Sequence, residues 1–217
     1  MSSKITIHNK DSENIYPNAA QLLIKSLKSH QKEKILILLS GGSVINLYKK
    51  LAGYIRSANI KNDSLVVGQV DERFKPENSK LETRNSNKTS KINSQIIGET
   101  GLWEVCNKKS IPYYLVSQEG TLEESAEKYD QTISKLFKEY TYKIAVLGIG
   151  EDGHTAGLIP GYRKEWDKDK YAVGYKITHR QENAWALSCP NFIRKRITLT
   201  PKALQKLDQV LVVASGE

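Results

Sequence analysis

An apolar run that stops at a glycine turn constrains the fold of this chain more than any other feature. Residues 34–39 read Lys-Ile-Leu-Ile-Leu-Leu and end at Ser40-Gly41-Gly42-Ser43. A run this short and this continuously apolar is typical of a strand that is buried on both faces of a parallel sheet. Residues 44–56 follow with apolar side chains at helical spacing. The order strand, glycine turn, helix predicts an α/β domain.

The same unit recurs along the chain. Its alternation of strands and helices predicts right-handed crossovers and a mostly parallel sheet with helices on both faces, a Rossmann-like α/β fold. The 217 residues contain no linker and no low-complexity segment, so we expect one domain over residues 1–217. Further strands are expected at 5–7, 65–70, 111–116, 143–147, 184–187, 196–199 and 209–214, and further helices at 17–30, 122–139 and 201–207.

Composition excludes several classes of protein. Lys and Arg number 33 against 24 Asp and Glu, a net charge of +9, which favours anionic partners. The basic residues are interleaved with acids and form no aromatic-basic stripe, so nucleic acid is not expected as a partner. No apolar run approaches the ~20 residues of a membrane span, and no signal peptide is recognisable. Cys106 and Cys189 form neither a disulfide framework nor a metal motif. We expect a cytoplasmic protein, a monomer or a small homo-oligomer.

Three turns at the ends of predicted strands carry the candidate site, because ligands of open α/β sheets bind beyond the carboxyl ends of the strands. The first is the glycine turn. Gly41 and Gly42 let the backbone approach a ligand closely, and the following N–H groups and the Ser43 hydroxyl suit a phosphate. The pattern is neither a Walker loop nor a dinucleotide fingerprint. An ordinary tight turn in which Ser43 caps a helix is equally compatible with it.

The second turn is Asp71-Glu72-Arg73. The planar fork of Arg73 can hold a phosphate through two hydrogen bonds, and Asp71 can orient that arginine or contact a hydroxyl. A surface ion pair of little energetic value is the alternative. The polar residues 77–90 that follow are predicted to form an ordered functional loop.

The third turn, residues 148–155, reads Gly-Ile-Gly-Glu-Asp-Gly-His-Thr. His154 can act as a general base near neutral pH, and Asp152 is the nearest carboxylate that could hold its tautomer, with Glu151 as the second candidate. A merely exposed histidine in a loop is the alternative. The chain has no metal-ligand spacing and no G-x-S-x-G motif, so neither a metal site nor a serine nucleophile is expected.

In this order, these motifs resemble the 6-phosphogluconolactonase family, within the wider glucosamine-6-phosphate isomerase/deaminase group. The resemblance covers most of the chain. It rests on residues 39–43 with the helix after them, residues 70–73 with Ser86-Asn87, residues 147–156, and residues 196–200, which read Arg-Ile-Thr-Leu-Thr.

The resemblance implies a sugar-phosphate isomerase-like fold and hydrolysis of the δ-lactone of 6-phosphogluconate, in the oxidative pentose phosphate pathway, without metal or organic cofactor. It implies that His154 activates water and that Asp152 orients the His154 side chain. It further implies that the phosphate is bound by Gly41, Gly42, Ser43, Arg73 and Arg196. Asp71 would contact sugar hydroxyls or hold Arg73 in place.

Two alternatives stay open at this point. An aminosugar-phosphate deaminase/isomerase of the same fold would carry tyrosine in place of Arg73 and a glutamate shortly after the histidine, where residues 158–161 read Leu-Ile-Pro-Gly. A noncatalytic phosphosugar-binding protein would keep the fold and lose the chemistry. Relatives usually continue past the last strand with a lysine and a helix, so the domain would lack that C-terminal helix.

Overall fold

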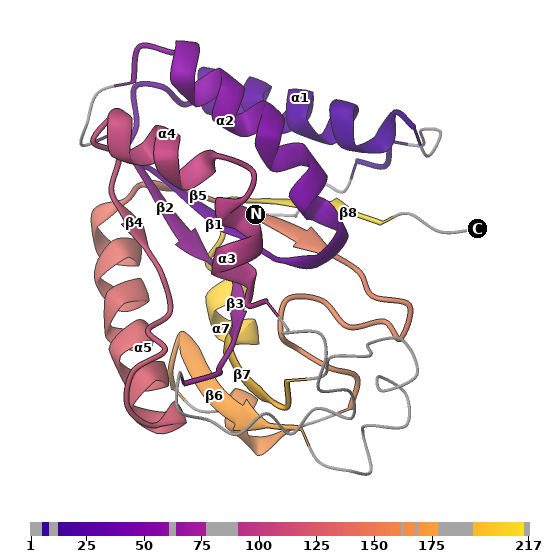
Figure 1. Cartoon of the computed structure of the whole chain (residues 1–217), viewed down its shortest axis with the longest axis vertical. Coiled ribbons are helices and arrows are strands. Elements are labelled where there is room, and N and C mark those ends of the chain that lie inside the picture. The colour runs from indigo at the N-terminus through magenta and orange to yellow at the C-terminus, as the bar shows by residue number, and fades with distance from the viewer. Residues whose placement is uncertain are drawn as a thin grey trace.

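The central layer is a parallel sheet. The computed structural model describes residues 6–8, 13–60, 64–76, 91–161, 163–167, 169–177 and 193–214. Within them, five parallel strands lie in the order β4-β2-β1-β5-β8 (Figure 1). This confirms the mostly parallel α/β sheet. The strands are β1 (Ile35–Leu39), β2 (Leu65–Gln69), β4 (Tyr113–Tyr114), β5 (Tyr142–Gly148) and β8 (Gln209–Val213).

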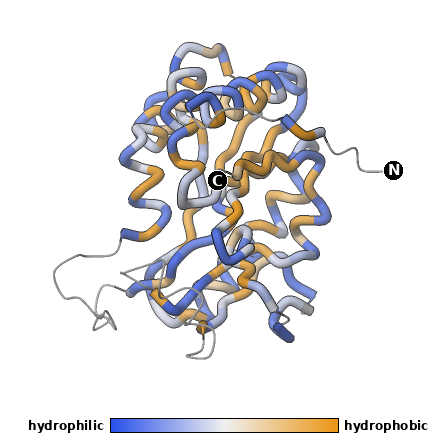
Figure 2. Tube along the Cα trace, turned by 90° about the vertical axis from the view of Figure 1, so that its right-hand side faces the viewer, coloured by the Kyte–Doolittle hydropathy of each residue, from blue (hydrophilic) through white to orange (hydrophobic). Residues whose placement is uncertain are grey.

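Helices cover both faces of this sheet, which explains why its middle strands are apolar throughout. Successive side chains of a strand point to opposite faces. Ile35, Ile37 and Leu39 pack in one core with α1 (Ile15–Ser29), α2 (Tyr48–Ser57) and α4 (Leu102–Lys108). Leu36 and Leu38 pack in a second core with α5 (Leu122–Glu139) and α7 (Pro201–Leu204). Figure 2 shows the hydrophobic residues concentrated along these central strands.

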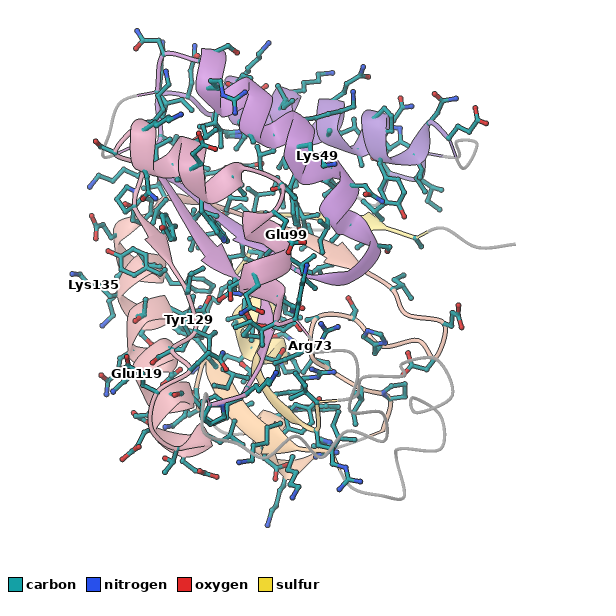
Figure 3. The ribbon with its side chains drawn as sticks, viewed as in Figure 1. Lys49, Arg73, Glu99, Glu119, Tyr129 and Lys135 are labelled. Carbon is teal, nitrogen blue, oxygen red and sulfur yellow. The ribbon has the colours of Figure 1, made fainter. Side chains whose placement is uncertain are left out.

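Helix α5 has the bounds that the sequence predicts. The Thr121 hydroxyl accepts a hydrogen bond from the Glu124 N–H at 3.1 Å, and the Glu124 carboxylate accepts one from the Thr121 N–H at 2.8 Å, so a capping box starts the helix. Tyr129, labelled in Figure 3, anchors α5 to the end of β2. Its hydroxyl donates to the Gln69 carbonyl at 2.5 Å and accepts from the Gln69 N–H at 2.7 Å.

A second, antiparallel sheet was not anticipated from the sequence. Its strands lie in the order β3 (Asp71–Arg73), β7 (Lys195–Leu199), β6 (Ala172–Lys176). Residues 71–73 therefore form a strand of their own rather than a loop. Val70 joins the two sheets, since its N–H donates to Leu39 of β1 and its carbonyl accepts from Leu199 of β7, both at 2.9 Å.

Several predicted elements differ in extent or lie outside the described residues. Thr6 and Ile7 form no strand, and only Tyr113 and Tyr114 of the segment 111–116 do. The helix after the glycine turn opens as a 3₁₀ helix, η1 (Gly42–Leu47). The predicted strand 184–187 and the predicted functional loop 77–90 lie outside the described residues. A 3₁₀ turn, η2 (Lys164–Asp167), and a short helix, α3 (Asn93–Gly98), were not predicted. In the described part of the chain, no helix is both long and apolar enough to span a membrane.

Candidate functional site

The glycine turn follows β1 and is anchored by Ser40. The buried Ser40 hydroxyl donates to the Val146 carbonyl of β5 at 2.6 Å, and its own carbonyl accepts from the Tyr48 hydroxyl at 2.8 Å. Gly42 has a φ of 76°, in the left-handed region that favours glycine. Ser43 is exposed, and a Cβ placed on Gly148 would lie 3.9 Å from its hydroxyl oxygen. The turn therefore lies beside the start of the histidine loop.

In the histidine loop, residues 148–157, His154 pairs with Asp152 as predicted. Nδ1 of His154 lies 2.5 Å from Oδ1 of Asp152, and the His154 side chain is 30% exposed. Glu151, the second candidate, is exposed to solvent. A neutral imidazole that donates its Nδ1 proton to the carboxylate carries a lone pair on Nε2, the arrangement that a general base requires. The loop folds tightly, since Gly150 N–H donates to the His154 carbonyl at 2.8 Å.

Asp71, Arg73 and Arg196 lie on one face of the antiparallel sheet, here called the charged face. Directly opposite residues of antiparallel strands share a face, as do alternate residues of one strand. Asp71 is opposite Thr198, and Arg73 is opposite Arg196, so these four side chains leave the same face. Figure 3 labels Arg73 at the end of β3, below α3 in that view. Glu72 leaves the opposite face.

The histidine loop is fastened to this charged face. The Gly157 N–H donates to the Thr198 hydroxyl at 3.0 Å, and the Gly157 carbonyl accepts from the Tyr175 hydroxyl. A Cβ on Gly157 would lie 2.7 Å from Cβ of Thr198 and 3.3 Å from Cβ of Asp71, so only glycine allows this approach. The loop that carries His154 thus lies directly against the strands that carry Asp71 and Arg196.

Asp71 interacts electrostatically with residues at or next to the other two turns. Burial raises the pKa of Asp71, while the positive charges of Arg196, of Arg73 and of a protonated His154 act to lower it. Burial and the charge of Asp71 raise the pKa of Tyr48, which follows the glycine turn. Together with the approach of Gly148 to Ser43 and of Gly157 to Thr198 and Asp71, these interactions bring the three predicted turns to one edge of the parallel sheet. In the described part of the chain, no group of three or more His, Cys, Asp or Glu side chains could hold a metal ion.

Sequence reasoning missed two residues of this region. Asn93 of α3 donates from Nδ2 to the carbonyl and to Oδ2 of Asp71, both at 3.1 Å. Arg163 places its guanidinium 4.3 Å from the ring centre of Tyr175, which is opposite Arg196. Neither residue lies in a recognisable local pattern. The Ser86-Asn87 pair of the predicted second motif lies outside the described residues.

The fold and these side chains define an α/β protein with a charged site at the carboxyl edge of its parallel sheet. The family model described as "Glucosamine-6-phosphate isomerases/6-phosphogluconolactonase" matches residues 10–217, and the chain belongs to this family.

Similar proteins carry related names. A "Probable 6-phosphogluconolactonase 1" of Arabidopsis thaliana is 25% identical over 214 residues, which cover 91% of this chain and 69% of that protein. The human "6-phosphogluconolactonase" is 24% identical over 184 residues, 82% of this chain and 63% of that protein, so the match spans less than two thirds of the human relative.

Two solved structures show how widely the fold is shared. The "6-phosphogluconolactonase from Trypanosoma brucei" has a TM-score of 0.70 and 20% identity, over 99% of this chain and 82% of that one. A monomeric glucosamine-6-phosphate deaminase has a TM-score of 0.57 and 16% identity, over 94% of this chain and 79% of that one. Because both enzymes share the fold, the choice between their chemistries rests on the site.

Proposed function

We propose that this chain hydrolyses 6-phospho-D-glucono-1,5-lactone to 6-phosphogluconate. The observation that carries the proposal is the His154–Asp152 pair at 2.5 Å, on a loop that packs against the face carrying Arg73 and Arg196. A general base and a dianion-binding pair are what a phosphorylated lactone requires. The names of the relatives support the same substrate.

The proposed reaction needs only water and side chains of the site. Nε2 of His154 takes a proton from water, and the water oxygen attacks the lactone carbonyl to give a tetrahedral intermediate. The bond from that carbon to the ring oxygen then breaks, and the ring oxygen takes the proton back from the imidazolium. Asp152 stabilises the imidazolium between these steps. No metal ion or organic cofactor enters the scheme.

Phosphate binding is assigned to the charged face and the glycine turn. Arg73 and Arg196 would neutralise the phosphate, with N–H groups of Gly41 and Gly42 and the Ser43 hydroxyl as further donors. Asp71, on the same face, would contact sugar hydroxyls or orient the arginines. Binding the phosphate far from the reacting carbon holds the ring in place, so that binding energy lowers the barrier.

A coupled assay that measures 6-phosphogluconate above spontaneous lactone opening tests the proposal. We expect His154→Ala to lower kcat about 10²- to 10⁴-fold, the usual contribution of general-base catalysis. Its affinity for 6-phosphogluconate should stay within a few-fold of wild type. His8→Ala, which alters an exposed histidine, is the matched control.

The outcomes of these assays distinguish the three functions that a protein of this fold could have. A folded wild-type protein with no turnover above background overturns the proposal. Release of ammonia from glucosamine 6-phosphate would instead establish an aminosugar-phosphate deaminase. Binding of 6-phosphogluconate with neither reaction would establish a noncatalytic phosphosugar-binding protein.

A further inference from the structure

Glu72, the middle residue of the Asp71-Glu72-Arg73 motif, is fully buried and turned away from the charged face. Its carboxylate accepts a hydrogen bond from Nε2 of Gln69 at 2.9 Å and one from the Arg73 N–H at 2.7 Å. It also accepts from the N–H groups of Asn93 at 2.6 Å and Ser94 at 2.7 Å. A buried carboxylate with this many donors is a structural anchor.

The anchor fixes the start of α3. Asn93 and Ser94 are the first residues of that helix, whose leading N–H groups have no partner within the helix. Glu72 supplies the acceptor from another element, 21 residues earlier in the chain. Burial raises the pKa of Glu72, and the hydrogen bonds from Gln69, Ser94, Asn93 and Arg73 oppose that rise. The first residue of α3 is thereby held against β3.

Asn93 lies between two parts of the candidate site. Its side chain is buried, with 3% of the residue exposed. Nδ2 donates to both the carbonyl and Oδ2 of Asp71. On the other side, a Cβ built on Gly41 would lie 2.2 Å from Oδ1 of Asn93, so the amide fills the space beside the glycine turn. One side chain therefore contacts both the Asp71 carboxylate and the backbone of the turn.

We propose that Asn93 is a positioning residue of the site, held by Glu72, whose amide sets the orientation of the Asp71 carboxylate and the position of the glycine turn. The kinetic part of this proposal rests on the proposed lactone hydrolysis. The hydrogen bonds at Asp71 do not, so the proposal can be tested without turnover. It also explains why position 41 requires glycine, since any side chain there would displace the amide.

Asn93→Asp keeps the shape of the side chain but removes the donor and adds a second negative charge beside Asp71. Losing a hydrogen bond to a charged group costs about 10- to 100-fold in binding, so KM for the lactone should rise by about that factor. We expect kcat to change much less, because the hydrogen bonds that hold the histidine loop go to Thr198 and Tyr175 and not to Asn93. Asn107→Asp, on the exposed side of α4, is the matched control.

The activity-independent readout is the pKa of Asp71, followed by ¹³C NMR of its carboxyl carbon. The groups whose charges act on Asp71 are Arg196, Arg73 and, when protonated, His154, and all three remain in the variants. Asn93→Ser, which shortens the side chain, should raise this pKa, and Asn93→Asp should raise it further because like charges oppose ionisation. Gly41→Ala should reproduce the rise in KM by pushing the amide aside.

Two results would overturn the proposal: an Asp71 pKa that is the same in wild type, Asn93→Ser and Asn93→Asp, or lactone KM values that match between Asn93→Asp and Asn107→Asp. If the wild-type protein shows no lactone hydrolysis, the proposed function fails. The NMR titration, together with the affinity for 6-phosphogluconate measured by calorimetry, still decides the role of Asn93.

Discussion

Arg73 of β3 lies directly opposite Arg196 of β7, so that two guanidinium-bearing side chains leave the same face of the antiparallel sheet. Like charges directly opposite each other destabilise a sheet. Asp71, two residues before Arg73 on the same face, offsets part of this repulsion. A bound anion would reduce this repulsion further, which links occupancy of the site to the stability of the small sheet.

Inorganic phosphate should therefore stabilise the protein. A ligand at 100 times its Kd adds about 2.7 kcal/mol, which corresponds to a rise in Tm of roughly 5 to 10 °C for a domain of this size. In Arg73→Gln the rise should be markedly smaller, because one cation of the pair is lost. Differential scanning calorimetry at increasing phosphate gives both values. Arg56→Gln, on the exposed side of α2, serves as control, and equal shifts in all three proteins would contradict an arginine phosphate site.

Asp152→Asn tests the orienting role of the carboxylate. The amide can still approach Nδ1, but it can present an N–H and favour the wrong tautomer of His154. We expect kcat to fall on the order of 10²-fold or more, while KM stays within a few-fold. Initial rates across lactone concentration measure both. The control Glu151→Gln neutralises the neighbouring exposed acid, and a comparable loss there would show that general charge, not pairing, is responsible.

Gly157→Ala tests the contact between the histidine loop and the small sheet. The new methyl group would lie 2.7 Å from Cβ of Thr198, and such overpacking costs about 1 to 3 kcal/mol. Urea unfolding should show this loss of stability together with lowered turnover. In Gly53→Ala, on the exposed side of α2, the methyl group meets nothing within 4 Å, so stability should rise by up to about 1 kcal/mol. Unchanged stability and turnover in Gly157→Ala would contradict the close packing of Gly157 against Thr198.

Asp71 should make the free energy of unfolding depend on pH, and Asp71→Asn should remove this dependence. Burial raises the pKa of this carboxyl in the folded state, so the folded protein binds its proton more tightly than the unfolded chain does. Between about pH 4, where an unfolded aspartate titrates, and the raised pKa, this group lowers the unfolding free energy as pH rises. The advantage of Asp71→Asn over wild type should thus grow across that window and then level off.

Urea unfolding at several pH values gives this difference, at about 1.4 kcal/mol for each unit by which the pKa is raised. Asp169→Asn provides a control of opposite sign, because the hydrogen bond from Lys202 lowers the pKa of Asp169. A difference between Asp71→Asn and wild type that does not change with pH would show that folding does not raise the pKa of this carboxyl.

Local patterns in the sequence were enough to predict the parallel layer. The apolar runs of β1 and β5 identify strands buried on both faces, and the capping box at Thr121 marks the start of α5. The His154–Asp152 pair could be predicted because only Gly153 separates the two residues. In each case the residues that determine the structure are neighbours in the chain.

The antiparallel sheet and Asn93 could not be predicted in this way. Residues 71–73 are all charged, and they form a strand only because β7, more than 120 residues later, pairs with them. Asn93 belongs to the site through its bonds to Asp71 and through the anchor at Glu72, both made across some 20 residues of chain. Nothing in the segment around Asn93 distinguishes it from a surface polar residue.

The connection between the two sheets at Val70 is as short as it can be. Val70 alone separates Gln69 of β2 from Asp71 of β3, and its peptide groups are bonded to both layers. Insertion of a single amino acid at this junction would shift the frame of β3 by one position, sending Glu72 to the ligand side and both Asp71 and Arg73 into the interior. A change of length at this crossing would therefore move Asp71 and Arg73 off the charged face, whereas an exchange of side chains would leave β3 in register.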